Sequence, residues 1–459
     1  MSALRRTLQG LWRALPLGLR TRIRTHPRLA GLARRVAPQP EPAIGGASPV
    51  AAGAADAAPQ IEIFEATLIQ GRVSAVSRPR LNLLLPTLKP EHVFGGILTA
   101  LQFYLELIGD DADARIILTD QGEPPETLPA LLTGWRMADA DDADESPGGA
   151  GRLIVPFAER GFRSLAVREH DVFVATAWWT AYVAQRVLPW QAQAYGRDMR
   201  PFIYLVQDHE PGFYPWSTRY TLAQSTYEFE GPMLGVFNTG LLRDYFSAQH
   251  YRFTRTWAFE PRLNATLAAW HARHDTFEKR RRLIVYGRPG VPRNAFELVC
   301  QGVRHWSAID PDSAHWEISS LGEPHGPVGL HQGNQIRSCG KLSLEQYAQT
   351  LAESALGVSL MYSPHPSYPP LEMAEFGVRT VTNTFANKDL SQRSADLIAL
   401  RSATPEAIGE ALKRLAAPWR KQAVVRVAKP AVSLFSGSDQ TYPFADEVRE
   451  AVGLRARYG

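Results

Sequence analysis

The sequence predicts an α/β protein built from two successive Rossmann-like, doubly wound domains that face each other across a cleft. Short, nearly all-apolar runs alternate with helical periodicity, which indicates parallel strands covered by helices on both faces. The alternation stops at a charged stretch, residues 278–282, and then starts again. The 459 residues also exceed what one hydrophobic core usually serves, so two domains of roughly 200 residues each are expected.

The first of these domains is expected at residues 61–277 and the second at residues 278–435. The last segment, residues 436–459, contains a helical pattern and is expected to cross back onto the first domain. Buried-strand runs in the first domain are residues 81–85, 114–120, 152–157, 171–178, 201–208 and 232–238, with a helix expected from residue 94. In the second domain the corresponding runs are residues 281–290, 315–322, 355–363 and 378–383.

The overall composition is that of a folded protein, with 45% hydrophobic and 21% charged residues. The two cysteines, Cys300 and Cys339, lie in no CxxC or Cys/His cluster. A disulfide framework or a zinc site is therefore not expected, and a reducing cytoplasm is the expected compartment. No apolar run reaches about 18 residues, so no segment is predicted to span a bilayer.

Residues 1–60 are predicted to be a basic segment followed by a flexible linker rich in Ala, Pro and Gly. Nine arginines and no acid precede residue 37, so from a net charge of +4 the rest of the chain carries −5. This distribution argues against a nucleic-acid-binding core. Leucines, Trp12 and the arginines suit peripheral contact of residues 1–36 with an anionic membrane surface. A free tail, or a helix docked on the body, is the alternative.

Residues 357–383 are predicted to form a buried strand, a proline-rich loop, a helix beginning near Pro370, a glycine stop at Gly377 and a further strand. The start of that helix is a plausible place for a diphosphate. Glu372 is expected within its first turn, where a carboxylate can accept hydrogen bonds from a ribose diol. The alternative is that Glu372 only offsets the helix dipole. Tyr368, in the loop, could stack on the base or bond a phosphate.

Arg288 follows the first strand of the second domain, at the edge where open α/β sheets bind ligands. Its guanidinium can grip a diphosphate through two oxygens; an arginine that caps the sheet edge is the alternative. In the first domain, Gly95 and Gly96 follow the first strand and would allow close approach of backbone to donor phosphates or to the acceptor sugar. A tight strand-to-helix turn explains this glycine pair equally well.

The acceptor is expected to bind at residues 202–220 of the first domain, where Gln207, Asp208 and His209 end a strand. Carboxylates bind sugar hydroxyls, and an aromatic loop follows with Phe213, Tyr214 and Trp216. Asp208 is the candidate base if the reaction inverts the anomeric centre. The alternative is a loop that only packs between the domains.

These windows resemble family 4 of the GT-B glycosyltransferases, and more closely the WsaF-type rhamnosyltransferases; the resemblance rests on residues 202–220, 285–296 and 357–383. In the family pattern, two glutamates separated by seven residues precede a glycine turn and a strand. Glu372 matches the second, which the resemblance implies holds the nucleotide ribose. The first would fall at Pro364, so Ser363, His365 or Tyr368 must fill the space. The resemblance also implies a basic residue near the phosphates, for which Lys341 is the candidate catalytic group.

The resemblance implies transfer of a deoxyhexose, L-rhamnose from dTDP-rhamnose, to a saccharide hydroxyl of a lipid-linked surface glycan, with retention of configuration. A non-catalytic nucleotide-sugar or glycan-binding protein on the same scaffold and a sugar-nucleotide epimerase are the alternatives. Asp139, Asp141 and Asp142 resemble a DxD metal motif but lie in an Ala/Asp/Gly-rich loop, so no metal or other cofactor is expected. The expected location is the cytoplasm, on the inner membrane if residues 1–36 bind lipid.

Overall fold

The computed structural model describes residues 62–93, 95–109, 111–141, 151–435 and 440–455. Apart from Glu62, all of them belong to a single unit, Ile63–Gly459. The basic segment, its expected membrane contact, the linker and Asp142 lie outside the described residues. In the described part of the chain, no helix combines the length and the apolar character needed to cross a membrane.

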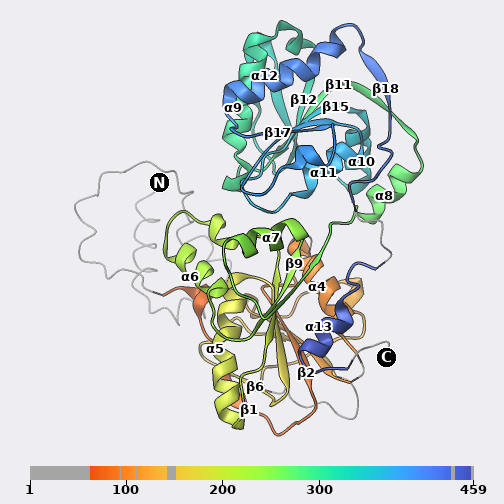
Figure 1. Cartoon of the computed structure of the whole chain (residues 1–459). Coiled ribbons are helices and arrows are strands. Elements are labelled where there is room, and N and C mark those ends of the chain that lie inside the picture. Colours follow the sequence, from red (N-terminus) through yellow and green to blue (C-terminus); the bar gives the residue numbers. More distant parts are fainter. Residues whose placement is uncertain (1–61, 94, 110, 142–150, 436–439, 456–459) are drawn as a thin grey trace, which may run out of the picture. The chain divides into compact units, whose positions relative to one another are not determined.

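A parallel sheet forms the centre of the first half of the chain (Figure 1). Its strands lie in the order β10-β9-β8-β7-β2-β3-β5-β4, and each neighbouring pair is parallel. A separate parallel pair consists of β1 and β6. The bounds are β1 (Gln70–Val73), β2 (Arg80–Leu85), β3 (Asp113–Leu118), β4 (Arg136–Met137), β5 (Arg152–Pro156), β6 (Ser164–Val167), β7 (Asp171–Ala175), β8 (Phe202–Val206), β9 (Met233–Asn238) and β10 (Arg255–Phe259).

A second sheet forms the centre of the other half, in the order β13-β14-β12-β11-β15-β16-β17. The strands from β14 to β17 are parallel, whereas β13 runs antiparallel to β14 and β18 runs antiparallel to the start of β11. The bounds are β11 (Thr276–Gly287), β12 (Glu317–Gly322), β13 (Val328–Gly329), β14 (Gln335–Gly340), β15 (Ser354–Val358), β16 (Arg379–Asn383), β17 (Leu397–Leu400) and β18 (Val424–Ala428).

Both sheets have the Rossmann strand order. Numbered along the chain, the parallel strands β14, β12, β11, β15, β16 and β17 lie in the order 3-2-1-4-5-6, and β5, β3, β2, β7, β8 and β9 follow the same order. The order reverses between β11 and β15 in one sheet and between β2 and β7 in the other. Ligands of open α/β sheets bind at the carboxyl ends of the strands beside such a reversal. The predicted pair of doubly wound units is confirmed.

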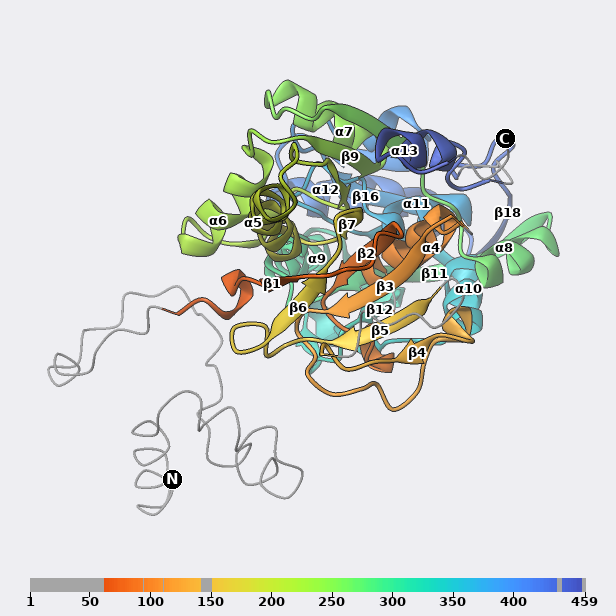
Figure 2. The same ribbon diagram turned by 90° about the horizontal axis from the view of Figure 1, so that it is seen from below.

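Helices cover both faces of each sheet (Figures 1 and 2). On the first sheet, α4 and α13 share a core with one face, and α5, α6 and α7 share a core with the other. On the second sheet, α9 and α12 cover one face, and α8, α10 and α11 pack on the other. The bounds are α4 (Gly96–Leu107), α5 (Trp178–Tyr195), α6 (Thr218–Tyr227), α7 (Gly240–Ala248), α8 (Ala265–Ala272), α9 (Phe296–Ile309), α10 (Leu344–Glu353), α11 (Tyr368–Glu375), α12 (Pro405–Ala416) and α13 (Ala445–Ala451).

The charged run at residues 278–282, which was expected to separate the domains, lies inside strand β11. Lys279 is buried between the exposed Glu278 and Arg280, and the two arginines that follow are partly exposed. The buried ammonium donates hydrogen bonds to the carbonyl oxygens of Leu351 (2.8 Å) and Phe376 (2.5 Å), at the ends of α10 and α11. Burial holds the pKa of Lys279 well below its ordinary value. The strand continues through the charged run because this cation has fixed acceptors.

Helix α13, in the last segment of the chain, packs on α4 of the first sheet. Val448 is fully buried in the core that α4 shares with that sheet. Tyr442 donates a hydrogen bond to the carbonyl oxygen of Thr99 at 3.4 Å. The buried guanidinium of Arg449 contacts the Leu107 carbonyl and the Asp111 carboxylate. The end of the chain is therefore fixed to the first sheet by apolar and charged contacts.

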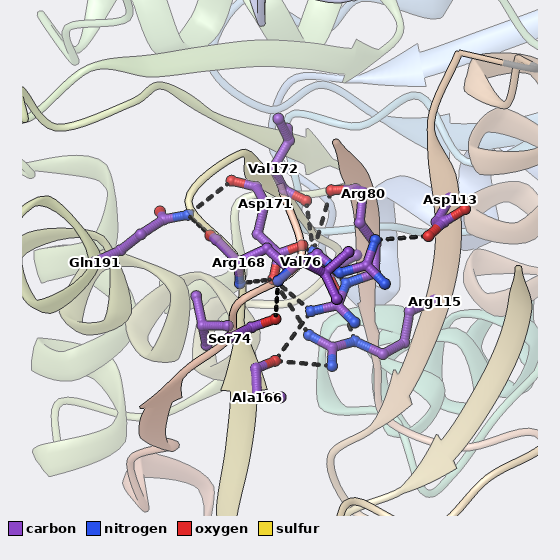
Figure 3. Close-up of polar contacts among 12 residues, drawn as sticks. Ser74, Val76, Arg80, Asp113, Arg115, Ala166, Arg168, Asp171, Val172 and Gln191 are labelled. Carbon is purple, nitrogen blue, oxygen red and sulfur yellow. Dashed lines mark hydrogen bonds and ion pairs between the residues drawn. The ribbon is translucent and has the colours of Figure 1, made fainter. Parts of the chain in front are cut away.

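A buried network of arginines and aspartates lies at the amino-terminal ends of β2, β3 and β7 (Figure 3). Arg80 grips Asp171 with two hydrogen bonds, of 2.8 and 2.7 Å. Arg168 contacts Asp113 at 2.6 Å, and Arg115 lies 3.5 Å from Asp171. Burial acts to raise the pKa of Asp171, but Arg80 and Arg115 outweigh it and hold the pKa below its ordinary value. These charges occupy the edge of the sheet opposite to the carboxyl ends, so we assign them to structure.

Candidate active site

The end of β8 and the loop after β15 meet at Asp208. The Asp208 carboxylate accepts a hydrogen bond on Oδ1 from the Ser363 hydroxyl and another from the His209 backbone N–H at 2.8 Å. The Nε atom of Arg293 lies 3.6 Å from Oδ2. No hydrogen bond to Oδ2 is found among the described residues, so this oxygen can accept one from a ligand. Asp208, which was expected to bind the acceptor, and Ser363, which was expected to bind the donor, are thus in contact.

Arg293 is a cation at this point that the sequence analysis missed. It lies in a short 3-10 helix, Pro292–Asn294, that follows β11. Its guanidinium carbon lies 3.7 Å from the centre of the Phe213 ring, a cation–π arrangement that fixes the planar group. Its buried Nε has no hydrogen-bond partner among the described residues. The feature of the sequence that could have identified Arg293 is that it is a second arginine, five residues after Arg288 in the same loop.

His365 presents a buried hydrogen-bond donor without a protein partner. Its Nδ1 accepts a hydrogen bond from the Ser367 backbone N–H at 3.0 Å. Burial lowers its pKa to about 4, with Asp208 opposing the shift, so the ring is neutral at pH 7 and carries its proton on Nε2. In the described part of the chain that buried Nε2 has no partner. An unpaired buried donor costs about 1–3 kcal/mol, which favours a ligand or a water molecule there.

The loop that carries Ser363 and His365 is anchored from three sides. The Asn383 side chain accepts from the Met361 backbone N–H at 2.7 Å, and Asn294 donates to the Leu360 carbonyl at 3.0 Å. The fully buried ammonium of Lys388 donates to the Met361 carbonyl. Burial lowers the pKa of Lys388 to about 7, and nearby Asp208 opposes the shift. A loop held in this way keeps its polar groups in fixed positions.

Helix α11 begins at Tyr368, so the expected start near Pro370 was two residues late. Because the helix begins at Tyr368, Glu372 lies in the second turn, and the first turn contains no acidic residue. Pro369 and Pro370 fall in the first turn and lack N–H groups, which leaves the helix start with fewer donors for a phosphate than expected. Gly377 ends the helix with a φ of 70°, as its predicted stop requires.

Tyr368 joins the start of α11 to the end of β9. Its hydroxyl donates a hydrogen bond to Oδ1 of Asn238 at 2.9 Å. Burial raises the pKa of this tyrosine to about 12, so the hydroxyl stays protonated. The ring centre lies 5.5 Å from that of His365. Because the hydroxyl is bonded to Asn238, the ring of Tyr368 is the part of the side chain that a ligand can contact.

Arg288 follows β11, and Glu372 lies on α11, after the neighbouring parallel strand β15, so both belong to the carboxyl edge near Tyr286 of β11. Burial raises the pKa of Tyr286; Arg288 opposes that shift, and Glu372 reinforces it. The Glu372 carboxylate accepts a hydrogen bond from the Tyr347 hydroxyl at 2.9 Å, and burial raises its pKa to about 7. The Nε atom of Arg288 lies 3.3 Å from Glu323, at the end of the neighbouring strand. The expected diphosphate-binding and ribose-binding residues are therefore close together, although Tyr286 and Tyr347 were not foreseen.

Lys341 is exposed directly after β14. Since β14, β12 and β11 are parallel neighbours, Lys341 lies on the same carboxyl edge as Arg288. The strand spacing puts the two strand ends about 10 Å apart. A lysine side chain can cover much of that distance, so the structure leaves Lys341 able to reach an extended anion on this edge.

Gly95, Gly96 and Gln207 come together at the carboxyl edge of the first sheet. Gln207 donates a hydrogen bond to the Gly96 carbonyl at 3.1 Å. A Cβ atom on Gly96 would lie 3.1 Å from the Gln207 amide oxygen, so the close approach favours glycine. Gly95 has a φ of 50°, which a residue with a side chain rarely adopts. This explains the glycine pair structurally and brings it together with one expected acceptor residue.

The side chain of His209 packs among aromatic rings and not with Gly95, Gly96 and Gln207. Its ring stacks on those of Tyr227 and Tyr251, and Nε2 lies 3.3 Å from the Tyr251 hydroxyl. Burial lowers the pKa of His209 to about 4, which keeps the ring neutral. The side chain therefore serves the aromatic core, and the contribution of His209 to the site is the backbone N–H that it donates to Asp208.

In the aromatic loop after β8, two aromatic side chains contact other residues of the protein and a third is exposed to solvent. The Tyr214 hydroxyl accepts a hydrogen bond from Trp178 at 2.9 Å, and Phe213 lies under a guanidinium. Trp216 is 89% exposed, and its ring is stacked on that of Tyr220 with the centres 5.0 Å apart. Of these three loop aromatics, Trp216 is the one with an open face for a sugar ring.

The aspartates that resemble a metal motif form surface ion pairs. Asp139 and Asp141 both contact the guanidinium of Arg163, the second at 2.9 Å. Among the described residues there is no group of three or more His, Cys, Asp or Glu side chains that could hold a metal ion. In the described part of this loop, Arg163 therefore balances the negative charges of Asp139 and Asp141.

Comparison with known proteins gives matches to two family models. Residues 80–240 match the N-terminal domain of WsaF, and residues 281–413 match its C-terminal domain. A curated relative, the O-antigen biosynthesis protein RfbC of Myxococcus xanthus, is 34% identical over 214 residues. That alignment covers 46% of this chain but only 15% of the relative.

Similar solved structures include the sucrose-phosphate synthase of Thermosynechococcus elongatus and WaaG, a glycosyltransferase involved in lipopolysaccharide biosynthesis. The first has a TM-score of 0.45 and 13% identity and covers 74% of this chain and 90% of its own. For WaaG the TM-score is 0.43 and the identity 11%, with 74% of this chain and 92% of that chain covered.

Proposed function

The chain belongs to the WsaF family, whose N-terminal and C-terminal domains it carries, and we propose that it is a glycosyltransferase of surface-glycan assembly. In this proposal it moves a deoxyhexose, L-rhamnose from dTDP-rhamnose, to a saccharide hydroxyl. The family resemblance supports this donor. The alignment to an O-antigen biosynthesis protein supports a surface glycan as the product. The acceptor is a saccharide, and we propose that it is linked to lipid.

The observation that carries the proposal is the position of Arg288 and Glu372 at the carboxyl edge of the second sheet, where Arg288 follows β11 and Glu372 lies on α11, after the neighbouring parallel strand β15. A guanidinium and a carboxylate at the carboxyl edge of a Rossmann sheet suit the two ends of a nucleoside diphosphate. Arg288 would bind the diphosphate with the N–H groups that Glu323 does not occupy. Glu372 would accept a hydrogen bond from the pentose, and the ring of Tyr368 would pack against the donor. No metal ion is needed if these cations neutralise the leaving group.

We assign departure of the nucleotide to the cations at this edge. When the bond between the sugar and the diphosphate breaks, negative charge develops on the leaving oxygen. Arg288 and Lys341 would stabilise that charge by fixed positive charge in a partly water-excluded site. The prolines in the first turn of α11 make these side chains more important, because the helix start offers few N–H donors.

We assign the carboxylate next to the transferred sugar to Asp208. The family pattern has a glutamate where this chain has Pro364, and the neighbouring Ser363 hydroxyl contacts Asp208. Oδ2 of Asp208 could accept the proton of the acceptor hydroxyl while that oxygen attacks the sugar. The Nε2–H of His365 could hold a sugar hydroxyl or a phosphate oxygen. Gly95, Gly96 and Gln207 would border the acceptor, with Trp216 further out.

The stereochemical course separates two roles for Asp208. With inversion, Asp208 is the base that takes the hydroxyl proton. With retention, which the family resemblance implies, the leaving diphosphate can take that proton, and Asp208 instead orients the sugar. Determining the anomeric configuration of the product by NMR distinguishes the two roles.

The test of the function is nucleotide release from dTDP-rhamnose by the purified protein, with and without a rhamnose-containing saccharide. A transferase releases dTDP mainly when the acceptor is present and forms a lengthened saccharide. An epimerase would change the sugar without needing an acceptor, and a binding protein would release nothing. Release that never depends on the acceptor contradicts the proposal. The same assay with UDP-glucose tests the choice of donor.

A further inference from the structure

We propose that Tyr347 makes the donor site prefer a 2′-deoxyribonucleoside diphosphate to a ribonucleoside diphosphate by occupying one oxygen of the Glu372 carboxylate. The inference rests on the proposed function, because it takes Glu372 as the group that binds the pentose. It adds the residue that determines which pentose is accepted. Tyr347 lies on α10 and is not among the site residues expected from the sequence.

The hydrogen bond between Tyr347 and Glu372 has a fixed direction. The phenol oxygen lies 2.9 Å from Oε2 of the carboxylate. Burial, reinforced by Glu372, raises the pKa of Tyr347 well above its ordinary value. The hydroxyl therefore stays protonated, and it is the donor to an ionised Glu372. Oε2 therefore already accepts one hydrogen bond before any nucleotide arrives, which leaves it a single lone pair for a ligand.

The tyrosine is held so that it cannot easily turn away. Helix α10 begins with a capping box in which Ser343 and Gln346 bond each other's backbone N–H. The Tyr347 ring packs in the apolar cluster that β11 shares with α8, α10 and α11, beside Leu342 and Tyr286. Moving the ring away from Glu372 would break this packing, and the hydroxyl would lose its hydrogen-bond partner.

The two oxygens of Glu372 differ in what they offer a ligand, because Oε2 has to be shared with Tyr347. Among the described residues, no hydrogen bond to Oε1 of Glu372 is found, and the side chain is partly exposed. A ribose presents adjacent 2′- and 3′-hydroxyls, which a carboxylate binds best with one hydroxyl on each oxygen. A 2′-deoxyribose presents only the 3′-hydroxyl, which Oε1 can accept without competition from Tyr347. A 2′-hydroxyl would have to share Oε2 with Tyr347 or stay unpaired.

The test compares two nucleotides, dUDP and UDP, which differ only in the 2′-hydroxyl. Each is titrated into the full-length protein by isothermal calorimetry at the same pH. The wild type should bind dUDP about tenfold more tightly, the effect of one poorly paired buried hydroxyl. In Tyr347→Phe, Oε2 becomes free, so the ratio should fall to about threefold or less through a gain in UDP affinity.

Tyr182→Phe provides the matched control, because Tyr182 lies on α5 of the first sheet and its variant should keep the wild-type ratio. Equal affinity of the wild type for dUDP and UDP overturns the inference alone. An unchanged preference in a folded Tyr347→Phe variant, checked by its melting temperature, also overturns it. If the wild type binds neither nucleotide, the proposed donor site fails and this inference fails with it.

Discussion

The Ser363 hydroxyl, in the loop after β15, donates a hydrogen bond to the Asp208 carboxylate at the end of β8. The two residues belong to different Rossmann sheets and are 155 positions apart. Around their contact lie a guanidinium, a buried ammonium and a neutral imidazole whose N–H has no partner among the residues that the structure describes. The Nε atom of Arg293 lies 3.6 Å from the other oxygen of this carboxylate, so positive charge surrounds it on the side of the loop after β11. In our account, Asp208 is therefore the acidic group next to the transferred sugar.

The substitution Asp208→Asn should abolish most transfer while donor binding persists. The amide keeps the shape of the side chain but removes its charge and its capacity to take a proton. We expect the transfer rate to fall by about 10²- to 10⁴-fold, with the Kd for dTDP changed less than about threefold. Single-turnover assays and calorimetry measure the two quantities. A variant that keeps a third of the wild-type rate would remove Asp208 from the chemistry.

The affinity for dTDP should depend on pH through Glu372. Burial raises the pKa of this carboxyl to about 7, and the ionised form is the better acceptor for the nucleotide hydroxyl. As the pH falls from 8 to 6, the ionised fraction falls about tenfold, and the affinity should fall with it. Glu372→Gln removes this group but keeps the ionisation of the diphosphate itself. Identical pH profiles for the variant and the wild type would contradict the role of Glu372.

Removing the exposed indole of Trp216 should weaken acceptor binding selectively. An open aromatic face in the loop that follows Asp208 suits the apolar side of a sugar ring. For Trp216→Ala we expect the acceptor KM to rise about tenfold, with the donor KM and the rate at saturating acceptor nearly unchanged. Phe162→Ala is the control, because Phe162 is 81% exposed in the same domain but lies outside the aromatic loop. Equal effects of the two substitutions would refute a sugar-binding role for Trp216.

The buried network of the first sheet should dominate its stability. Asp171→Asn leaves Arg80 and Arg115 without their common counter-charge in a buried setting. Breaking a buried ion pair in this way typically costs about 3–5 kcal/mol, which urea denaturation measures. Asp244→Asn, at an exposed pair with Arg243, should change the free energy of unfolding by less than about 0.5 kcal/mol. A similarly small effect at Asp171 would show that other contacts hold the strand ends together.

Local sequence patterns were sufficient to predict the fold. Runs such as residues 81–85 and 355–363 are apolar enough to identify strands buried on both faces, and their alternation with helices identifies the doubly wound units. The sequence analysis did not predict that the charged run at residues 278–282 belongs to a strand, because this depends on distant carbonyl groups. Lys279 is tolerated inside a strand only because Leu351 and Phe376 accept its hydrogen bonds.

The candidate site was only partly predictable for a similar reason. Residues at strand ends, such as Arg288 and Asp208, follow from the rule that ligands bind at carboxyl edges. Arg293 and Tyr347 owe their importance to neighbours that are 80 and 25 positions away: Phe213, which lies under the guanidinium, and Glu372. No local pattern contains such contacts. The packing of His209 among aromatic rings was not predicted for the same reason, because its partners Tyr227 and Tyr251 lie outside its local sequence.

The most direct test of the central claim is a crystal structure of the protein with dTDP. Our account predicts that the diphosphate lies within hydrogen-bond distance of Arg288 at the carboxyl edge of the second sheet, with the 3′-hydroxyl on Glu372. A complex in which dTDP binds elsewhere, with Arg288 and Glu372 both free of it, would contradict the account.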